Sequence, residues 1–262
     1  MSITYTASGI PRIIHQTWKD RNIPEKWRKS YTEWQRLHPG WMYILWTDED
    51  IRNHIAQHHP KLLGIHDNYE YAIQRADMIR YVVLHDFGGV YSDLDLYPVT
   101  NIEPLLAGCS DTYFVYSANT DCFTNALMVS RQGAPLWLEV FNRLRKPLPW
   151  WAVGKHLKVM KSTGPLMLTE ALRNTRTAYT VLPQTIFNPY SVEDDFGAEK
   201  QGVAIRTLEG SSWHAWDSSL YNFAFKHRVG LAILAAVAVL VIIVCLVYYV
   251  RKYKQCRKAC PL

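Results

Sequence analysis

Two aspartates separated by a single residue, Asp93 and Asp95, are the side chains of this sequence best suited to chemistry. They follow Gly88 through a segment that reads as a glycine turn and a short strand. In an extended strand, side chains two positions apart point the same way, so we expect both carboxylates to face one point. A Mg²⁺ or Mn²⁺ ion held by such carboxylates keeps open positions for phosphate oxygens. The pair therefore indicates a metal site for a phosphate-bearing substrate.

A second charged pair, Asp77 and Arg80, precedes this turn on an expected helix. Residues three positions apart share a helix face. One interpretation is a surface ion pair that contributes about 0.3 kcal/mol to helix stability. In the other, Asp77 accepts hydrogen bonds from sugar hydroxyls and Arg80 binds the sugar or a phosphate.

Hydrophobic periodicity predicts the elements that position these side chains. Strands are expected at residues 12–18, 42–46, 90–94, 113–117, 126–129 and 179–182. Helices are expected at residues 24–38, 49–57, 69–87, 135–145 and 165–174. Thr47 and Asp50 give the second helix a capping box, and Gly88 follows the third where a left-handed residue is wanted. Alternating strands and helices indicate an α/β domain with a mainly parallel sheet, in which ligands gather at the carboxyl ends of the strands.

The C-terminal part of the chain differs in character. Residues 229–250 are uncharged and apolar, and a helix of that length spans about 33 Å, enough for one membrane crossing. A buried core helix is the alternative, but basic residues on both sides favour an anchor. We therefore expect a soluble domain at residues 1–220, a transmembrane helix at 229–250 and a basic tail at 251–262.

The net charge of +6 and the pI near 9.0 do not indicate a nucleic-acid partner. Seven of the 29 basic residues lie beyond Tyr221, where no acidic residue occurs, which leaves 22 basic against 23 acidic residues before it. The basic flanks of the apolar segment suit anionic lipid head groups. The five cysteines lack zinc-site spacing; Cys109 and Cys122 are either a disulfide pair or two thiols.

Four segments in this order resemble the signatures of the DXD-containing glycosyltransferases of family 32: Ile10-Pro-Arg-Ile-Ile-His-Gln-Thr-Trp18, Trp46-Thr-Asp48, Arg75-Ala-Asp-Met-Ile-Arg80 and Gly88-Gly-Val-Tyr-Ser-Asp-Leu-Asp95. This family includes fungal mannosyl inositol phosphoceramide synthases and the initiating mannosyltransferases of yeast outer chains. The resemblance covers most of the soluble region. It implies a GT-A-type, Rossmann-like fold, a retaining transfer and a Mn²⁺-dependent nucleotide-sugar donor, with GDP-mannose as the expected one.

The resemblance also implies roles for individual residues. Asp93 and Asp95 would bind ribose and metal and form the catalytic centre with Asn125, which lies under the anomeric carbon or else caps a strand. The implied donor-binding residues are Trp18, Asp77, Arg80, Gly89, Tyr91 and Trp213. Trp18 would lie beside the nucleotide base, with a place in the core as the alternative.

The segment Ser212-Trp213-His214 resembles the closing motif of the family. It implies His214 as a third metal ligand, and a structural histidine is the alternative.

The same resemblance implies an inositol phosphoceramide-like lipid as acceptor and a possible regulatory membrane subunit as partner. The aromatic loop at residues 147–151 is expected either to touch the membrane or to pack into the core. Five basic residues in the tail favour a cytosolic tail and a lumenal domain in the Golgi or ER membrane. The first twenty residues show no signal-peptide pattern, so a tail-anchored cytosolic domain, or a targeting segment upstream of the given start, stays open.

Three other functions are weighed against this interpretation. Haloacid-dehalogenase-type phosphatases also use Asp-x-Asp, but they need an apolar strand before it and Thr or Val where this chain has Tyr97. Transfer to glycoprotein or polysaccharide acceptors is an alternative within the same reaction class. A non-catalytic, membrane-anchored subunit that binds a sugar nucleotide is the third.

Overall fold

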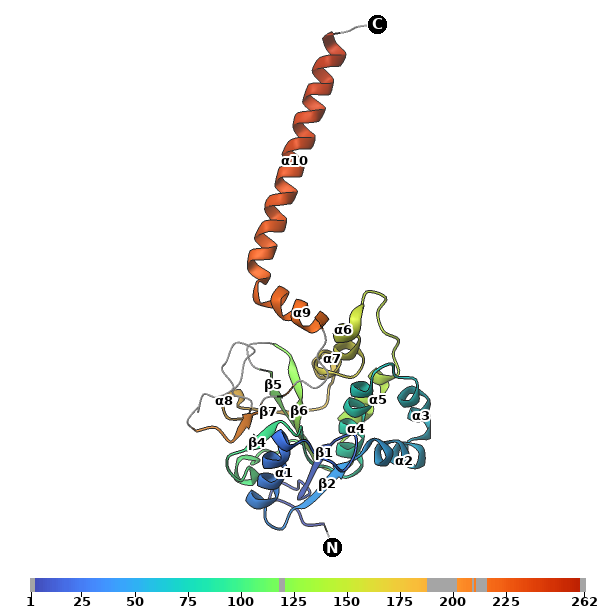
Figure 1. The fold of residues 1–262 in the computed structure, drawn as a ribbon, viewed down its shortest axis with the longest axis vertical. Coiled ribbons are helices and arrows are strands. Elements are labelled where there is room, and N and C mark those ends of the chain that lie inside the picture. The colour runs from blue at the N-terminus through green and yellow to red at the C-terminus, as the bar shows by residue number, and fades with distance from the viewer. Residues whose placement is uncertain (1–2, 118–120, 188–201, 209, 211–215, 260–262) are drawn as a thin grey trace. The chain divides into compact units, whose positions relative to one another are not determined.

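A computed structural model describes residues 3–117, 121–187, 202–208, 210 and 216–259 (Figure 1). The chain divides into two compact units, Met1–Trp213 and His214–Leu262. Its strands are β1 (Ile13–Thr17), β2 (Met42–Trp46), β3 (Gly89–Ser92), β4 (Leu96–Pro98), β5 (Thr112–Tyr116), β6 (Phe123–Ser130), β7 (Thr180–Leu182) and β8 (Ile205–Thr207). Its helices are α1 (Glu25–Leu37), α2 (Asp48–His58), α3 (Pro60–Asp67), α4 (Ala72–Asp86), α5 (Leu136–Leu144), α6 (Gly154–Ser162), α7 (Pro165–Asn174), α8 (Gln184–Phe187), α9 (Trp216–Lys226) and α10 (Arg228–Ala259), with a 3₁₀ turn at Glu103–Leu105.

Six strands form one sheet in the order β2-β1-β3-β6-β5-β7, and β4 pairs with β8 in a separate ribbon. The pairs β1–β2, β1–β3 and β5–β7 are parallel, whereas β6 runs antiparallel to both β3 and β5. Five strands of the large sheet therefore point the same way and one is reversed. The predicted α/β class with a mainly parallel sheet is confirmed.

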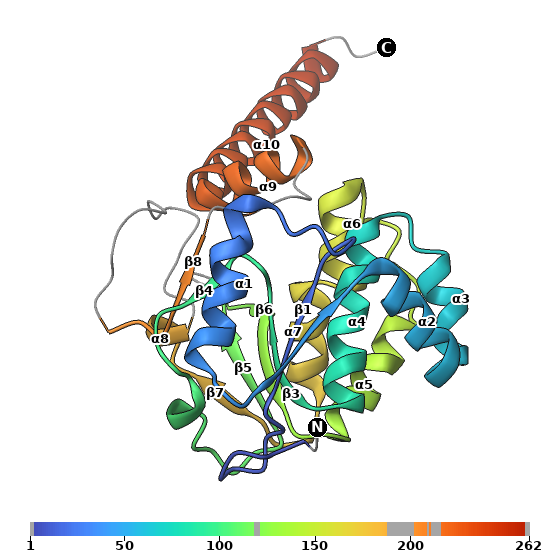
Figure 2. The same ribbon diagram turned by 60° about the horizontal axis from the view of Figure 1, so that its bottom comes forward.

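Helices cover one face of the sheet, and α1 with the small ribbon covers the other (Figure 2). Each face of the sheet has its own hydrophobic core. Neighbouring residues of a strand pack into different cores, because successive side chains point to opposite faces. Tyr91 and Phe114 pack with the residues of α2, α3, α4, α5 and α7. Val90 and Val115 pack with Trp34 of α1 and with β8.

The course of the chain through β1, β2 and β3 creates a crevice at one edge of the sheet. After β1 the chain passes through α1 to β2 on one side, and it then returns through α4 to β3 on the other side. In open α/β sheets, ligands bind at the carboxyl ends of strands where the strand order reverses in this way. Trp18 follows β1 and Asp93 follows β3 at this edge.

The turn between α4 and β3 depends on two glycines. Gly88 has φ +66°, as expected of a residue that closes a helix, and Gly89 has φ +93°. A Cβ on Gly89 would overlap the carbonyl oxygen of Ile13, so β3 can approach β1 only with glycine there. The helix predicted from residue 69 begins at Ala72 because Tyr71 is extended and donates its N–H to the Gln74 Oε1.

In its described residues, 216–259, the C-terminal unit contains α9 and α10. Among the residues that the structure describes, one helix has the length and composition to cross a membrane: Arg228–Arg251, with a mean hydropathy of 3.3. It covers the apolar run expected at residues 229–250. Within the N-terminal unit, no disulfide joins the two thiols of Cys109 and Cys122.

His15, in the middle of β1, connects three segments of the fold. Its ring is fully buried, with the Trp46 Nε1 3.1 Å from its Nδ1 and the Gly88 carbonyl oxygen 2.9 Å from its Nε2. An indole N–H can only donate, so Nδ1 must be the acceptor and the Nε2 N–H donates to Gly88. Burial lowers the pKa of His15 to about 4. The neutral ring therefore joins β1, β2 and the glycine turn before β3.

This histidine should make the folded protein sensitive to mild acid. The unfolded chain takes up the proton near pH 6.5 and the folded chain only near pH 4, so the free energy of unfolding should fall as the pH drops through this window. The full contribution is about 3 kcal/mol. We expect His15→Gln to have a lower midpoint of thermal unfolding at pH 7 than the unaltered protein, and its midpoint to depend less on pH. Circular dichroism measures both. If the unfolding midpoints of the two proteins changed equally with pH, His15 would not be the source of the acid sensitivity.

Candidate active site

A cavity of about 410 Å³ opens at the carboxyl edge of the sheet. Its walls come from the ends of β1 and β3, from the first half of α4, and from single residues of α1, α2 and α6. The residues that line it are Thr17, Trp18, Lys19, Trp27, Asp48, Glu70, Tyr71, Ala72, Ile73, Ala76, Arg80, Asp93, Leu94, Asp95 and Lys155. Four of the residues singled out in the sequence thus share one cavity.

Asp93 and Asp95 reach this cavity from a turn. The expected strand over residues 90–94 was wrong at its end, because β3 stops at Ser92 and the Leu96 N–H donates to the Asp93 carbonyl 3.1 Å away. The Asp93 N–H still donates to Ala126 at 2.8 Å, so the turn begins from a fixed point beside β6. Both carboxylates line the cavity, although strand alternation is not the reason.

The guanidinium of Arg80 joins three elements beneath the cavity. Its Nη2 lies 2.9 Å from the Asp77 carboxylate, and its Nη1 lies 3.1 Å from that of Asp93. The same Nη1 donates to the backbone carbonyl of Asn125 at 3.0 Å. These contacts connect α4 with the end of β3 and the start of β6. Asp77 and Arg80 are 3% and 5% exposed, so the interpretation as a surface ion pair was wrong.

Tyr91 holds Asp93 from the other side. Its hydroxyl donates to the Asp93 Oδ1 at 2.8 Å and lies 3.0 Å from the Thr17 Oγ1. Because the phenol has one proton, Thr17 donates to Tyr91. The Arg80 guanidinium lies over the Tyr91 ring, 5.0 Å from its centroid. Asp93 therefore has one orientation set by Tyr91 and Arg80.

Asp77 is the most deeply buried carboxylate of this network. Its Oδ1 accepts from the Asn125 amide at 3.1 Å and its Oδ2 from the Thr163 hydroxyl at 3.0 Å. Burial raises the pKa of Asp77 to about 6, and the charge of Arg80 opposes that rise. The pKa of Arg80 stays above its usual value, with the neighbouring carboxylates outweighing its burial. Neither Asp77 nor Asn125 is among the cavity-lining residues, and both support Arg80 from behind.

The residues at the cavity fit a divalent cation. Burial first, and then the charge of Asp93, raise the pKa of Asp95 to about 7. Among the described residues, Arg80 is the one cationic side chain in an ion pair with Asp77 or Asp93, and Asp95 has none. Two carboxylates thus share one guanidinium and the third has no ion pair, so a cation between Asp93 and Asp95 would balance the excess negative charge. Oxygen ligands of this kind suit Mg²⁺ or Mn²⁺.

Trp18 forms one wall of the cavity together with Trp27. The two rings meet edge to face with their centroids 5.1 Å apart. The Trp18 Nε1 is buried and has no hydrogen-bond partner in the described part of the chain. A buried donor without a partner costs free energy, so this atom is suited to a ligand that brings an acceptor.

One further predicted site residue lies away from the cavity. Gly89 starts β3 against β1, at the opposite end of the strand from Asp93, and does not line the cavity. Trp213 and His214 lie outside the described residues. Earlier in the sequence, the Leu208 N–H donates to the Asp95 carbonyl at 2.7 Å, and a Cβ on Gly210 would overlap the Asp95 carboxylate. The chain after β8 therefore returns to the aspartate turn.

Several cavity residues had no role in the sequence-based interpretation. Ala72 and Ala76 precede Arg80 at intervals of four, a spacing that puts all three on one helix face. That signal was available in the sequence. Lys155 was not predictable in the same way, because it lies on α6, a helix that the periodicity did not indicate.

Comparison with known proteins identifies the family. Residues 24–111 match the model of the glycosyltransferase sugar-binding region containing DXD motif. Inositol phosphoceramide mannosyltransferase 1 of Schizosaccharomyces pombe is 30% identical over 241 residues, which cover 88% of this chain and 72% of that protein. The chain belongs to the DXD-containing glycosyltransferase family. The matched region includes Asp77, Arg80, Asp93 and Asp95.

Two further relatives are longer than this chain. Inositol phosphoceramide mannosyltransferase 3 of S. pombe is 34% identical over 84% of this chain and 60% of its own length. Mannosyl phosphorylinositol ceramide synthase SUR1 of Saccharomyces cerevisiae is 33% identical over 83% of this chain and 55% of its own length. The chain thus spans somewhat more than half of these two relatives. Among solved structures, the glycosyltransferase domain from the YGT toxin aligns with 72% of this chain at 10% identity and a TM-score of 0.47.

Removing the charge of Arg80 should destabilise the fold through the carboxylates left behind. We expect Arg80→Met to lower the free energy of unfolding by about 3–5 kcal/mol, because Asp77 would remain buried without a countercharge. The double variant Asp77→Asn with Arg80→Met should lose less than the sum of the two single losses. The midpoint of thermal unfolding in detergent measures all three. Additive losses would show that the two side chains do not act as a pair.

Proposed function

We propose that this chain is a metal-dependent retaining glycosyltransferase that transfers mannose from GDP-mannose to an inositol phosphoceramide-type lipid. The observation that carries the proposal is the cavity where Asp93, Asp95 and Arg80 meet at the carboxyl edge of the sheet. Family membership supports the reaction class, since the relatives described above are named as mannosyltransferases or mannosyl phosphorylinositol ceramide synthases. The retaining stereochemistry is proposed from the family resemblance.

The donor half of the site is proposed residue by residue. Asp93 and Asp95 hold the cation and the ribose, and Arg80 faces the sugar or the diphosphate. Trp18 lies beside the base, and its Nε1 without a partner supports a hydrogen bond to the nucleotide. When bound, the cation neutralises charge that develops on the leaving diphosphate. Asp77 and Asn125, which bond to Arg80 and to each other, keep this edge of the cavity in place.

The chain contributes mainly position and electrostatics to the proposed reaction. Tyr91 and Arg80 fix the Asp93 carboxylate before any ligand binds, so little reorganisation is needed when charge develops. In a front-face transfer, the leaving diphosphate itself accepts the proton of the acceptor hydroxyl. The protein then has to hold donor and acceptor in contact within the cavity.

An exposed aromatic loop supports a membrane-embedded acceptor. Trp150 and Trp151 are 92% and 45% exposed, so the alternative that this loop packs into the core does not hold for them. The loop leads into α6, whose Lys155 lines the cavity. Tryptophan is enriched where proteins meet the membrane interface. We infer that the loop contacts the bilayer and brings lipid head groups to the cavity rim.

The helix Arg228–Arg251 is the proposed anchor. Its apolar side chains are exposed within the C-terminal unit, and its length fits one crossing of the hydrocarbon core. The five basic residues of the tail favour a cytosolic position for that end. We therefore propose a single-pass protein with a lumenal domain in the Golgi or ER membrane, where an acceptor lipid and a tethered active site share one surface.

Loss of the aspartate pair should abolish the metal-dependent reaction. We expect Asp93→Asn and Asp95→Asn to lower Mn²⁺-dependent hydrolysis of, or transfer from, GDP-mannose by about 100-fold or more, because charge on the diphosphate is no longer balanced. The matched control is Asp111→Asn, which removes a surface carboxylate paired with Arg131. Full activity in the Asp93 and Asp95 variants would overturn the metal assignment.

The same assays separate the alternative functions. Binding of GDP-mannose in isothermal titration without turnover would indicate a non-catalytic subunit. Turnover with glycoprotein or polysaccharide acceptors, and none with inositol phosphoceramide, would identify the acceptor as a glycoprotein or polysaccharide.

We expect the aromatic loop to affect only the reaction with the lipid acceptor. We expect Trp150→Ala to raise the KM for inositol phosphoceramide in vesicles by about tenfold, since an interfacial tryptophan loses its buried area. Hydrolysis of the donor without acceptor should not change. The control is Leu138→Ala on α5, which removes another exposed apolar side chain. Equal effects of the two variants would argue against a specific membrane contact of the loop.

A further inference from the structure

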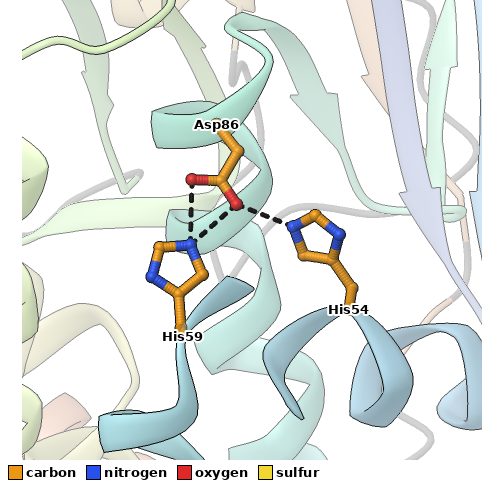
Figure 3. Close-up of side chains that lie close together, drawn as sticks. All are labelled: His54, His59 and Asp86. Carbon is orange, nitrogen blue, oxygen red and sulfur yellow. Dashed lines mark hydrogen bonds and ion pairs between the residues drawn. The ribbon is translucent and has the colours of Figure 1, made fainter. Parts of the chain in front are cut away.

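A second group of candidate metal ligands lies outside the donor cavity. Figure 3 shows His54 of α2 and His59, which follows that helix, with their ring nitrogens directed at the Asp86 carboxylate at the end of α4. The His54 Nε2 lies 2.7 Å from the Asp86 Oδ2, and the His59 Nε2 lies 2.7 Å from the same oxygen. The side chains of His54, His59 and Asp86 are 10%, 16% and 15% exposed. The group is thus compact and largely enclosed.

A third histidine holds the carboxylate from the other side. The His85 Nδ1 lies 2.7 Å from the Asp86 Oδ1. Partial burial alone would raise the pKa of Asp86, but the hydrogen bonds of the three histidines hold it well below its usual value. An ionised carboxylate only accepts, so each ring donates an N–H to it. His85 therefore orients Asp86 toward the other two rings, as a residue behind a metal ligand does.

The ligand atoms have the spacing that a small cation requires. One nitrogen from each of His54 and His59 and one oxygen of Asp86 all lie within 4.8 Å of one another. Zinc binds imidazole nitrogen and carboxylate oxygen at about 2.0–2.2 Å in a tetrahedral arrangement. A cation among these three atoms would replace the two N–H protons that now point at the carboxylate. Small adjustments of the side chains are sufficient for that exchange.

The group is separate from the donor site in space and in chemistry. None of its residues lines the cavity, and Asp86 ends the 15-residue helix α4 whose first turns form the cavity wall. Arg80 is the cavity residue of α4 nearest to Asp86, and the six positions from one to the other correspond to about 9 Å along the helix axis. The donor site offers carboxylates, which suit Mg²⁺ or Mn²⁺, whereas two imidazoles and one carboxylate suit zinc and its neighbours in the transition series.

We propose that His54, His59 and Asp86 form a binding site for a transition-metal cation of the zinc type, independent of the donor site. The cation connects the junction of α2 and α3 to the end of α4. Its role is structural: it fixes the far end of the helix that carries Asp77 and Arg80. Three of the four tetrahedral positions come from the chain, and the fourth remains for water or another small ligand.

The full chain, purified in detergent without a polyhistidine tag, tests this site with zinc alone. Competition with a chromophoric chelator should reveal a bound Zn²⁺, and zinc should raise the midpoint of thermal unfolding. His54→Gln and His59→Gln each keep an N–H donor for Asp86, so they preserve the fold while removing a metal ligand. Each should weaken zinc binding by about 100-fold or more.

Two controls separate this site from other sources of zinc binding. His58→Gln removes an exposed imidazole whose ring centroid is 4.6 Å from that of His54, and it should leave the zinc affinity unchanged. Asp93→Asn with Asp95→Asn should abolish Mn²⁺-dependent turnover and keep the zinc site. With Co²⁺ in place of zinc, visible absorption typical of tetrahedral coordination should appear in the unaltered chain and disappear in His59→Gln.

The proposal is overturned if the unaltered chain binds zinc no better than His54→Gln and His59→Gln do. It is also overturned if the Asp93 and Asp95 variant loses zinc to the same extent, because the two sites would then be one. Both readouts are independent of glycosyl transfer, so a failure of the proposed function leaves this result interpretable.

Discussion

The structure at the carboxyl edge of the sheet depends on the buried guanidinium of Arg80. Enclosing a cation inside a protein costs several kcal/mol unless charges and hydrogen bonds compensate it. Here the compensation comes from α4 itself through Asp77, from the turn after β3 through Asp93, and from the first residues of β6 through the Asn125 carbonyl. Since each partner lies on a different element, the same contacts that solvate the cation fix the relative positions of those elements.

This arrangement leaves an excess of negative charge on the cavity side. Asp77 is neutralised from within the protein, whereas Asp95 has no cationic partner among the described residues and its pKa is raised to about 7. A protein surface normally avoids such a concentration of acidic groups. In a site that takes a divalent cation with a diphosphate, the excess is the condition for binding. The packing of α4 and the negative charge of the cavity therefore have a common physical origin.

Local patterns in the sequence predicted the parts of the fold that local interactions determine. The capping box of Thr47 and Asp50 is present in α2, and Gly88 has the left-handed conformation that its position after α4 required. The α/β class followed from the alternation of elements. Residue type and spacing singled out Asp93, Asp95 and Arg80, and motif resemblance singled out Trp18; all four line one cavity.

The elements that the sequence did not predict depend on contacts between distant segments. Strands β4 and β8 have three residues each and pair across the chain from Leu96 to Thr207, so neither carries a periodic signal of its own. Helix α6 buries only Val159 among its nine residues, which gives no apolar stripe to recognise. The turn at Asp93 was missed because the hydrogen bond from the Leu96 N–H to the Asp93 carbonyl joins backbone atoms. Such a bond does not require particular residue types, so the sequence gives no signal for it.

The pairing of β4 with β8 also sets the order in which the site can form during synthesis. The aspartate turn leads directly into β4, but the partner strand β8 begins more than a hundred residues later, at Ile205. Contacts between such distant segments form late in folding, after the intervening chain has been made. The aspartate turn that lines the cavity is therefore translated early, and its contact with the segment after β8 forms last.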